Sequence, residues 1–261
     1  MKKISRNICI SLVAEDGYLP GVLVTVVSFL KHNPWFTGDI VIFDAGLSKK
    51  NQKILKRKLR CLYFRPIPKQ IYDAEYSKTN RFPKRLIPAF YKFEFFGLTD
   101  YDLVIGLDTD LLIQSELSKF LEITNGLGAC KAISIDGQIN TGVMVIGTEY
   151  LNLNTVSMLL SGIVPFADKV ADQNVISHFF YEKASYFNPE YNAIKQVRLK
   201  EESEFDKCRI IHYTGKKPWQ KIRLDRADKI WMKFYRRDVS WLMWARLLLS
   251  RSLLVTGLKF S

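Results

Sequence analysis

Two carboxylates lie two residues apart inside an apolar run, in residues 103–113 (LVIGLDTDLLI). Side chains at positions i and i+2 of an extended chain point to the same side, so Asp108 and Asp110 are expected side by side at the end of a buried strand. Charges this close raise each other's proton affinity or need a cation. Oxygen donors suit magnesium or manganese, which often bridge to phosphate oxygens. The pair predicts a metal site, with a simple turn as the alternative.

A second group of reactive side chains lies in residues 210–219 (IIHYTGKKPW). A strand would deliver His212, and an imidazole joining two carboxylates fits manganese better than an all-oxygen cage. Gly215 would let the backbone approach a ligand closely. Lys216 and Lys217 offer positive charge to a phosphate. The alternative is a core histidine beside a basic surface turn.

Two further segments carry polar side chains at the ends of predicted elements. Asn140 precedes a strand in INTGVMVIG, and its amide can hydrogen-bond a sugar hydroxyl. Asp172 and Gln173 open a predicted helix in ADQNVI, where they could contact hydroxyls. A plain turn and a helix cap are the alternatives.

These side chains need a framework, and the apolar pattern supplies one. Strands are expected at about 8–14 and 39–45, and helices at 20–31 and from a Ser48 cap to Leu59. This alternation predicts an α/β fold with a parallel sheet and helical crossovers. Residues 61–85 read as irregular, and 86–98 as a helix. Farther along, the pattern predicts helices at 115–121, at 153–161 and from Asp172, and strands in the apolar runs 128–135 and 143–147.

Composition restricts the class of protein. The 261 residues are 48% hydrophobic, which is enough for a substantial core. The four cysteines are scattered without C-x-x-C spacing, so reduced thiols in a cytoplasm are expected. The first residues read as a strand rather than a signal peptide, and no apolar run is long enough to span a membrane.

The basic excess is concentrated near the C-terminus. The net charge is +13, and residues 216–261 hold twelve Lys or Arg against three Asp, a net of +9. In residues 227–254, basic side chains alternate with Trp, Tyr, Phe and Leu in a long helical pattern typical of a helix in a membrane interface. The alternative is a terminal helix docked on the domain. We expect a catalytic domain over 1–222 and a membrane-associating region over 223–261, while nucleic acid is an unlikely partner.

Together these segments resemble glycosyltransferase family 8, the retaining sugar transferases of GT-A fold. Five segments match in the order of the family, over roughly residues 8–219: LVAEDGYLPGVLVTVVSFLKHNP, FYKFEFFGLTDYDLVIGLDTDLLI, INTGVMVIG, ADQNVI and IIHYTGKKPW. The resemblance implies a single GT-A domain with a mixed, mostly parallel sheet.

The resemblance also implies a role for each matched residue. Asp108, Asp110 and His212 would hold manganese, or magnesium, against the diphosphate of a UDP-sugar. Val13, Ala14 and Glu15 would surround the base, and Asp108 would also touch the ribose. Tyr18 and Thr109 are further residues expected to bind the donor. Gly215 and Lys217 would contact the diphosphate, and Lys92 would reach the diphosphate or the donor sugar. Asn140, Asp172 and Gln173 would line the donor sugar. Asp172, Gln173 and Lys217 are the candidate catalytic residues.

Three departures from the family pattern affect the expected contacts. Gly17 replaces an Asn common in the family, Lys92 replaces an Arg, and the last motif is one residue shorter between Gly215 and Pro218. The shorter spacing leaves Lys216 as an alternative to Lys217 at the diphosphate.

The expected function is transfer of galactose or glucose from a UDP-sugar to a glycan or lipid-linked acceptor, such as lipopolysaccharide or another bacterial surface polysaccharide. The basic tail would place the enzyme at the inner face of the plasma membrane, in the cytoplasm. A metal-dependent nucleotidyltransferase is one alternative, although it usually needs two metals. A membrane- or nucleic-acid-binding protein with a decayed transferase site is another.

Overall fold

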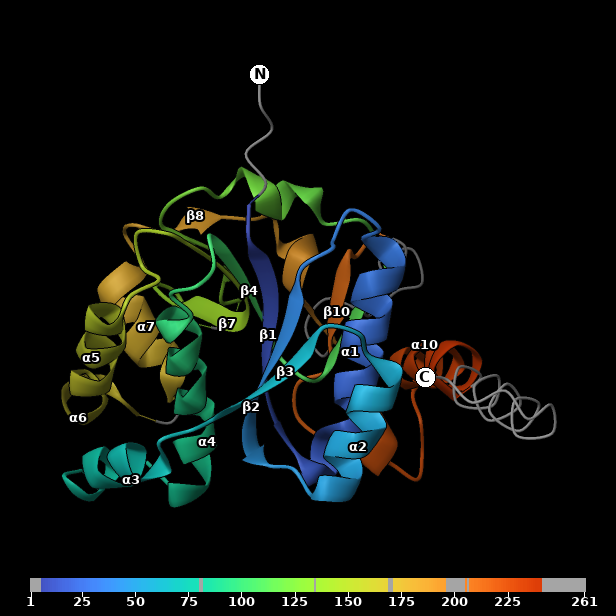
Figure 1. Cartoon of the computed structure of the whole chain (residues 1–261), viewed down its shortest axis with the longest axis horizontal. Coiled ribbons are helices and arrows are strands. Elements are labelled where there is room, and N and C mark those ends of the chain that lie inside the picture. The colour runs from blue at the N-terminus through green and yellow to red at the C-terminus, as the bar shows by residue number, and fades with distance from the viewer. Residues whose placement is uncertain are drawn as a thin grey trace, which may run out of the picture.

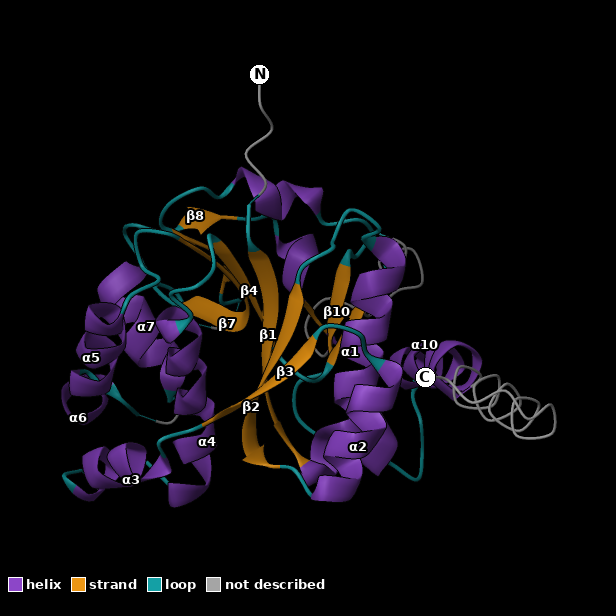
Figure 2. Ribbon diagram, viewed as in Figure 1, coloured by secondary structure: helices purple, strands orange, loops and turns teal. Residues whose placement is uncertain are grey.

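A seven-stranded sheet forms the centre of the molecule (Figures 1 and 2). The computed structural model describes residues 6–79, 82–133, 135–168, 171–195, 205 and 207–240. The sheet has the order β3-β2-β1-β4-β7-β6-β8. Its strands are β1 (Ile8–Glu15), β2 (Asp39–Gly46), β3 (Leu62–Pro66), β4 (Leu103–Leu107), β6 (Leu127–Lys131), β7 (Ile139–Gly147) and β8 (Ser185–Tyr186). Only β7 runs antiparallel to its neighbours β4 and β6, so the predicted mixed, mostly parallel sheet is confirmed.

A smaller sheet lies beside the large one and carries part of the site. It consists of β5 (Leu111–Ile113), β10 (Ile210–His212) and β9 (Ala193–Ile194), in that order. The middle strand β10 is antiparallel to β5 and parallel to β9.

Helices cover both faces of the large sheet (Figure 1). One side has α1 (Leu19–His32) and α2 (Lys49–Lys58), and the other has α3 (Lys69–Ser77), α4 (Ile87–Phe90), α5 (Leu153–Ser161), α6 (Ile163–Phe166) and α7 (Asp172–Phe180). Alternate side chains of a strand point to opposite faces. Accordingly, Ile10 and Leu12 of β1 join the core beneath α1, while Cys9 joins the core on the other face.

Several predicted elements are confirmed. The expected strands and helices between residues 8 and 59 are present, and the Ser48 hydroxyl caps α2 by accepting from Asn51 N at 3.3 Å. Helix α5 has the predicted bounds, and α7 begins at Asp172 as expected.

The reading of residues 61–85 as irregular was wrong, because β3 and α3 lie there. β3 pairs with β2 at the edge of the sheet, and it consists of exposed or half-buried residues, so its sequence lacks a buried strand's apolar run. The expected helix over 86–98 is mostly a 3-10 helix, Tyr91–Gly97, after the single turn of α4. Its aromatic residues Phe93, Phe95 and Phe96 are all buried, so they do not form the single stripe of an amphipathic α-helix.

Two strands differ from expectation near the reactive segments. The run LVIGLDTDLLI is two strands in different sheets, because the chain leaves β4 after Leu107 and enters β5 at Leu111. Strand β7 begins at Ile139, so Asn140 lies inside the strand rather than before it.

The C-terminal region is described as far as residue 240. Helix α10 (Arg226–Phe234) continues into a π-helical turn, Tyr235–Ser240, and Trp231 and Phe234 are buried in the same core as α1. These two aromatic residues therefore dock on the domain, whereas residues 241–261 of the predicted membrane region lie outside the described part. Within the described residues, no helix has the length and apolar character needed to cross a membrane.

Candidate active site

Strand pairing brings the two carboxylates and the histidine together. Asp108 directly follows β4, whose five residues are all buried. Asp110 directly precedes β5, and the antiparallel register pairs Leu111 with His212 of β10. Asp108 N donates to Gly142 O and Tyr213 N donates to Asp110 O, each at 2.9 Å, so the backbone is fixed on both sides.

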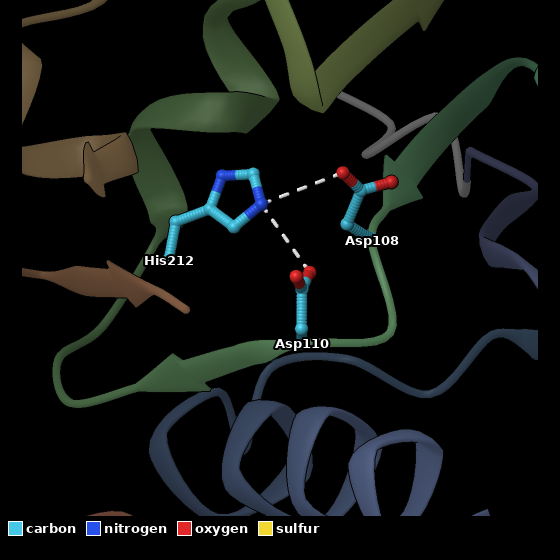
Figure 3. A group of neighbouring side chains, drawn as sticks. All are labelled: Asp108, Asp110 and His212. Atoms are coloured by element: carbon cyan, nitrogen blue, oxygen red, sulfur yellow. Dashed lines mark ion pairs between the residues drawn. The ribbon is translucent and has the colours of Figure 1, made fainter. Parts of the chain in front are cut away.

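The three side chains point toward one another (Figure 3). His212 Nε2 lies 3.5 Å from Asp108 Oδ2 and 3.2 Å from Asp110 Oδ1. One ligand atom from each residue lies within 4.8 Å of the others. Two carboxylate oxygens and one imidazole nitrogen form a donor set that suits a divalent cation such as manganese, so the residues present fit a metal ion.

Each carboxylate also has an ammonium partner. Lys92 Nζ lies 2.7 Å from Asp108 Oδ1, and Lys217 Nζ donates to Asp110 Oδ2. Burial raises the pKa of Asp110, but the charges and hydrogen bonds of His212 and Lys217 outweigh it, so the pKa lies well below its usual range. Asp110 is therefore held ionised at neutral pH, as a metal ligand must be.

Lys92 also links this cluster to α7. Its Nζ lies 3.4 Å from Asp172 Oδ2, which also accepts a 2.5 Å hydrogen bond from the Thr141 hydroxyl. Burial lowers the pKa of Lys92, but attraction to Asp108 and Asp172 outweighs that effect and raises the pKa above its ordinary value. Burial raises the pKa of Asp172 against the opposing effect of Lys92.

Two cavities meet at this cluster. The first, of about 370 Å³, is lined by six of the residues expected to bind the donor: Val13, Ala14, Glu15, Tyr18, Asp108 and Thr109. The second, of about 300 Å³, is lined by Asn140, Asp172, Gln173, Gly215 and His212. Lys92, Asp108, Asp110 and Lys217 line both. Asp108 and Asp110 therefore lie at the junction of the two cavities.

The two neighbouring lysines, Lys216 and Lys217, differ in burial. Lys217 is 9% exposed and faces both cavities, whereas Lys216 is exposed and is not among the residues that line them. The indole of Trp219 donates to Gly17 O at 3.0 Å and so ties this loop to the end of β1.

Two residues at the site were not identified from the sequence. Arg85 lines the first cavity, but it lies in the segment read as irregular. Asn192 lies 2.9 Å from His212 Nδ1 through its Oδ1 atom. In the sequence NPEYN it resembles a turn residue, and only the pairing of β9 with β10 brings it to the histidine.

Sequence comparison identifies relatives across most of the chain. The model of "Glycosyl transferase family 8" matches residues 9–223. Glycosyltransferase GlyF of Streptococcus pneumoniae serotype 4 is 23% identical over 253 residues, covering 89% of this chain and 62% of the relative. Glycosyltransferase GlyA of the same strain is 25% identical over 253 residues, covering 91% of this chain and 36% of the relative. The chain thus spans less than two thirds of the length of either relative.

Structure comparison identifies the same fold. Galactosyltransferase LgtC, solved in complex with donor and acceptor sugar analogs, superposes with a TM-score of 0.67 at 19% identity, covering 86% of this chain and 94% of LgtC. GlyE of Streptococcus pneumoniae TIGR4 superposes with a TM-score of 0.68 at 17% identity, covering 95% and 64%. These similarities confirm the predicted GT-A fold. The family match over residues 9–223 shows that the chain belongs to glycosyl transferase family 8, whose GT-A enzymes use nucleotide-sugar donors and a divalent metal.

Proposed function

We propose that the chain is a retaining, metal-dependent hexosyltransferase that moves galactose or glucose from a UDP-sugar to a glycan or glycolipid acceptor. The observation that carries this proposal is the junction of the two cavities at Asp108 and Asp110. A nucleotide sugar has a nucleoside at one end, a hexose at the other and a diphosphate between them. The first cavity, the charged junction and the second cavity would hold the nucleoside, the diphosphate and the hexose in that order.

The first cavity would hold the nucleoside. Glu15 would read the edge of uracil, with Val13 and Ala14 against the ring and Tyr18 beside it, because all four line this cavity. Lys217 would contact the diphosphate at the junction, and the exposed Gly215 would let the backbone of its loop approach the same group.

The second cavity would hold the donor sugar. Asn140 and Gln173 would hydrogen-bond its hydroxyls, and Asp172 would do so while holding Lys92 in place. Asp172 and Gln173 are also the two side chains that we would test as a nucleophile, because they lie on the wall of this cavity.

Transfer follows from the placement of charge. The bond from the anomeric carbon to the diphosphate breaks, and its electron pair leaves with UDP. The oxygen of the acceptor hydroxyl forms the new bond to that carbon, and its proton passes to the diphosphate oxygen that leaves. Lys217 stabilises the negative charge that develops on the leaving oxygen, an effect that is often the largest in catalysis. A divalent cation at Asp108, Asp110 and His212 would supply further positive charge to the diphosphate.

The acceptor that we propose is lipopolysaccharide or another bacterial surface polysaccharide built on a lipid carrier. LgtC, described as a galactosyltransferase, supports a galactose donor. The basic residues after α10 support a peripheral position at the inner face of the plasma membrane.

A donor panel tests the proposal. UDP-galactose, UDP-glucose, UDP-N-acetylglucosamine and a GDP-sugar are each incubated with manganese and with EDTA, and release of the nucleotide is measured. We expect manganese-dependent release of UDP from UDP-galactose or UDP-glucose. Asp110→Asn should lower that rate by about 100-fold or more, whereas Asp73→Asn, on the exposed face of α3, should leave it unchanged.

If no donor in the panel releases its nucleotide, UDP binding is measured by calorimetry, since the absence of an acceptor can hide turnover. If UDP also fails to bind in a manganese-dependent way, the proposal is wrong. Family membership argues against a nucleotidyltransferase, and the intact Asp108–Asp110–His212 cluster argues against a decayed site.

A further inference from the structure

A series of amide hydrogen bonds leads away from the Nδ1 atom of His212. Its Nδ1 atom lies 2.9 Å from Asn192 Oδ1, and Asn192 Nδ2 donates to Asn140 Oδ1 at 2.8 Å. The backbone N–H of Gly142 donates to the same Asn140 oxygen at 2.9 Å. The two asparagines and the histidine are 7% exposed or less, so water does not compete for these bonds.

The donor and the acceptor of every hydrogen bond in this series follow from one bond, the one that the backbone N–H of Gly142 donates. A backbone N–H can only donate, so the atom of Asn140 that faces Gly142 is the oxygen. An oxygen only accepts, so Asn192 must turn its NH₂ group toward Asn140 and its own oxygen toward His212. His212 Nδ1 must then carry a hydrogen in order to donate to that oxygen. An imidazole that binds a metal through Nε2 carries no proton on that atom, and Nε2 then has its lone pair toward Asp108 and Asp110.

We infer that Asn192 and Asn140 are positioning residues that fix His212 in the tautomer and ring orientation able to bind a metal through Nε2. This inference rests on the proposed function, because it assigns a metal to that atom. Metal-bound histidines generally donate their other N–H to an oxygen, which fixes the ring and raises its basicity. Here the oxygen belongs to an amide whose own orientation is set by the backbone of β7.

The packing around Gly142 supports the same arrangement. A Cβ atom on this residue would lie 2.4 Å from His212 Cε1 and 2.7 Å from Nδ1, so the imidazole sits directly against the backbone. The register of β6 against β7 shifts between Ala129 and Cys130, opposite residues 141–143 of β7. Such irregularities often re-aim the chain beside a functional site.

This series of hydrogen bonds also restricts how Asn140 can contact a donor sugar. Its oxygen already accepts two hydrogen bonds, which uses both lone pairs. Asn140 lines the second cavity, so only its NH₂ group is left to hydrogen-bond there. It would therefore donate to a sugar oxygen and never accept from a hydroxyl.

The first test reads the tautomer without any metal. The full chain is prepared with ¹⁵N-labelled histidine, and its three imidazoles are followed by NMR at alkaline pH. A His212→Gln spectrum assigns the signal. We expect the proton on Nδ1 in the wild type and in Asn192→Asp, which keeps an oxygen toward the ring. Asn192→Ala should lose this preference. A wild-type His212 with its proton on Nε2 would overturn the inference.

The second test measures binding of manganese in the presence of UDP by calorimetry. Asn192→Ala should weaken manganese binding by about 10- to 100-fold, and Asn192→Asp by less. The matched control is Asn125→Ala, because Asn125 also accepts a side-chain hydrogen bond but lies outside both cavities. Unchanged affinity in a folded Asn192→Ala protein would also overturn the inference. If the wild type bound no manganese, the proposed metal site would fail, while the NMR test would still decide the tautomer.

Discussion

Gly142 lies where the site has no room for a side chain. Its carbonyl accepts from Asp108 N, and the neighbouring Val143 pairs with Leu107 of β4, so the backbone is held against a buried strand. In Gly142→Ala, the added methyl group would push the His212 ring away from the carboxylates. We expect at least about tenfold weaker manganese binding and a loss of about 1–3 kcal/mol in the free energy of unfolding. Calorimetry and urea unfolding measure these effects.

Gly97→Ala is the matched control for this substitution. Its Cβ atom would lie 3.4 Å from Val156 Cγ2, an ordinary van der Waals contact, so the same methyl group is added without displacing a ligand. Equal manganese affinity in Gly142→Ala and the wild type would show that the ring can move without consequence.

The sequence identifies the candidate metal ligands but not the side chains that hydrogen-bond to them. Asp108, Asp110 and His212 are recognisable because carboxylate and imidazole side chains are the expected ligands of a divalent cation. Asn192 has no such signal, since an amide in a turn is common and its function depends on strand pairing eighteen to twenty residues along the chain, from β9 to β10. Asn140 was predicted to face the sugar, and its second contact with Asn192 depends on the fold.

Helix α10 begins at a cluster of charges that joins three parts of the chain. Asp225 caps the helix by accepting from Asp228 N, and Lys195 Nζ lies 2.5 Å from a carboxylate oxygen of each aspartate. Lys221 Nζ lies 2.7 Å from Asp228 Oδ2. Since Asp228 is fully buried, its charge needs these partners. The cluster connects the start of α10 to both ends of the segment that carries His212 and Lys217.

This cluster predicts a pH dependence of stability. Burial raises the pKa of Asp225, but hydrogen bonds from Lys195 and from the backbone of Asp228 outweigh it, and the net pKa is well below 3.8. A carboxyl group with a depressed native pKa stabilises the fold above its unfolded pKa, and that contribution is lost as the pH falls toward the native value. The free energy of unfolding should therefore decrease below about pH 5.

Asp225→Asn isolates the charge, because asparagine also caps helices well. We expect the free energy of unfolding to fall by about 1 kcal/mol or less at pH 7, since half of the Asp225 side chain is exposed and solvent screens the ion pair. Below about pH 5, the free energy of unfolding of this variant should decrease less steeply than that of the wild type. Urea unfolding between pH 2.5 and 7 measures both, with the exposed Asp73→Asn as control. Parallel pH curves for Asp225→Asn and the wild type would contradict the assignment.

At the level of elements, prediction succeeded where a strand or helix has one strong apolar signal. β1, α1 and α5 have such signals. It failed at β3, whose edge position leaves half-polar residues, and at Tyr91–Gly97, where aromatic side chains are buried in more than one direction. In both cases the deciding contacts come from residues distant in sequence.

At the scale of the whole molecule, the C-terminal region packs against the loop that follows His212. Trp231 packs at a tilt against Trp219, with ring centroids 5.1 Å apart, and stacks on Tyr235 at 5.4 Å, so α10 supports the loop that carries Lys217. These aromatic residues are therefore part of the catalytic domain's packing. The sequence beyond the described part still holds Trp241, Trp244 and three basic residues, Arg246, Arg251 and Lys259. We propose that membrane contact depends on residues 241–261.

A chain cut after Ser240 tests this division of roles, because it removes those residues and keeps the contact between Trp219 and Trp231. Three basic side chains near an anionic surface contribute about 1 kcal/mol each, so binding to anionic vesicles should fall on the order of 100-fold in a sedimentation assay. Manganese-dependent UDP binding should not change, since the residues lining both cavities end at Lys217. High salt applied to the full chain separates the contribution of charge from that of the tryptophans. If the shortened chain still bound vesicles, the membrane contact would lie on the described surface, where α2 presents six basic residues in ten, Lys49, Lys50, Lys53, Lys56, Arg57 and Lys58.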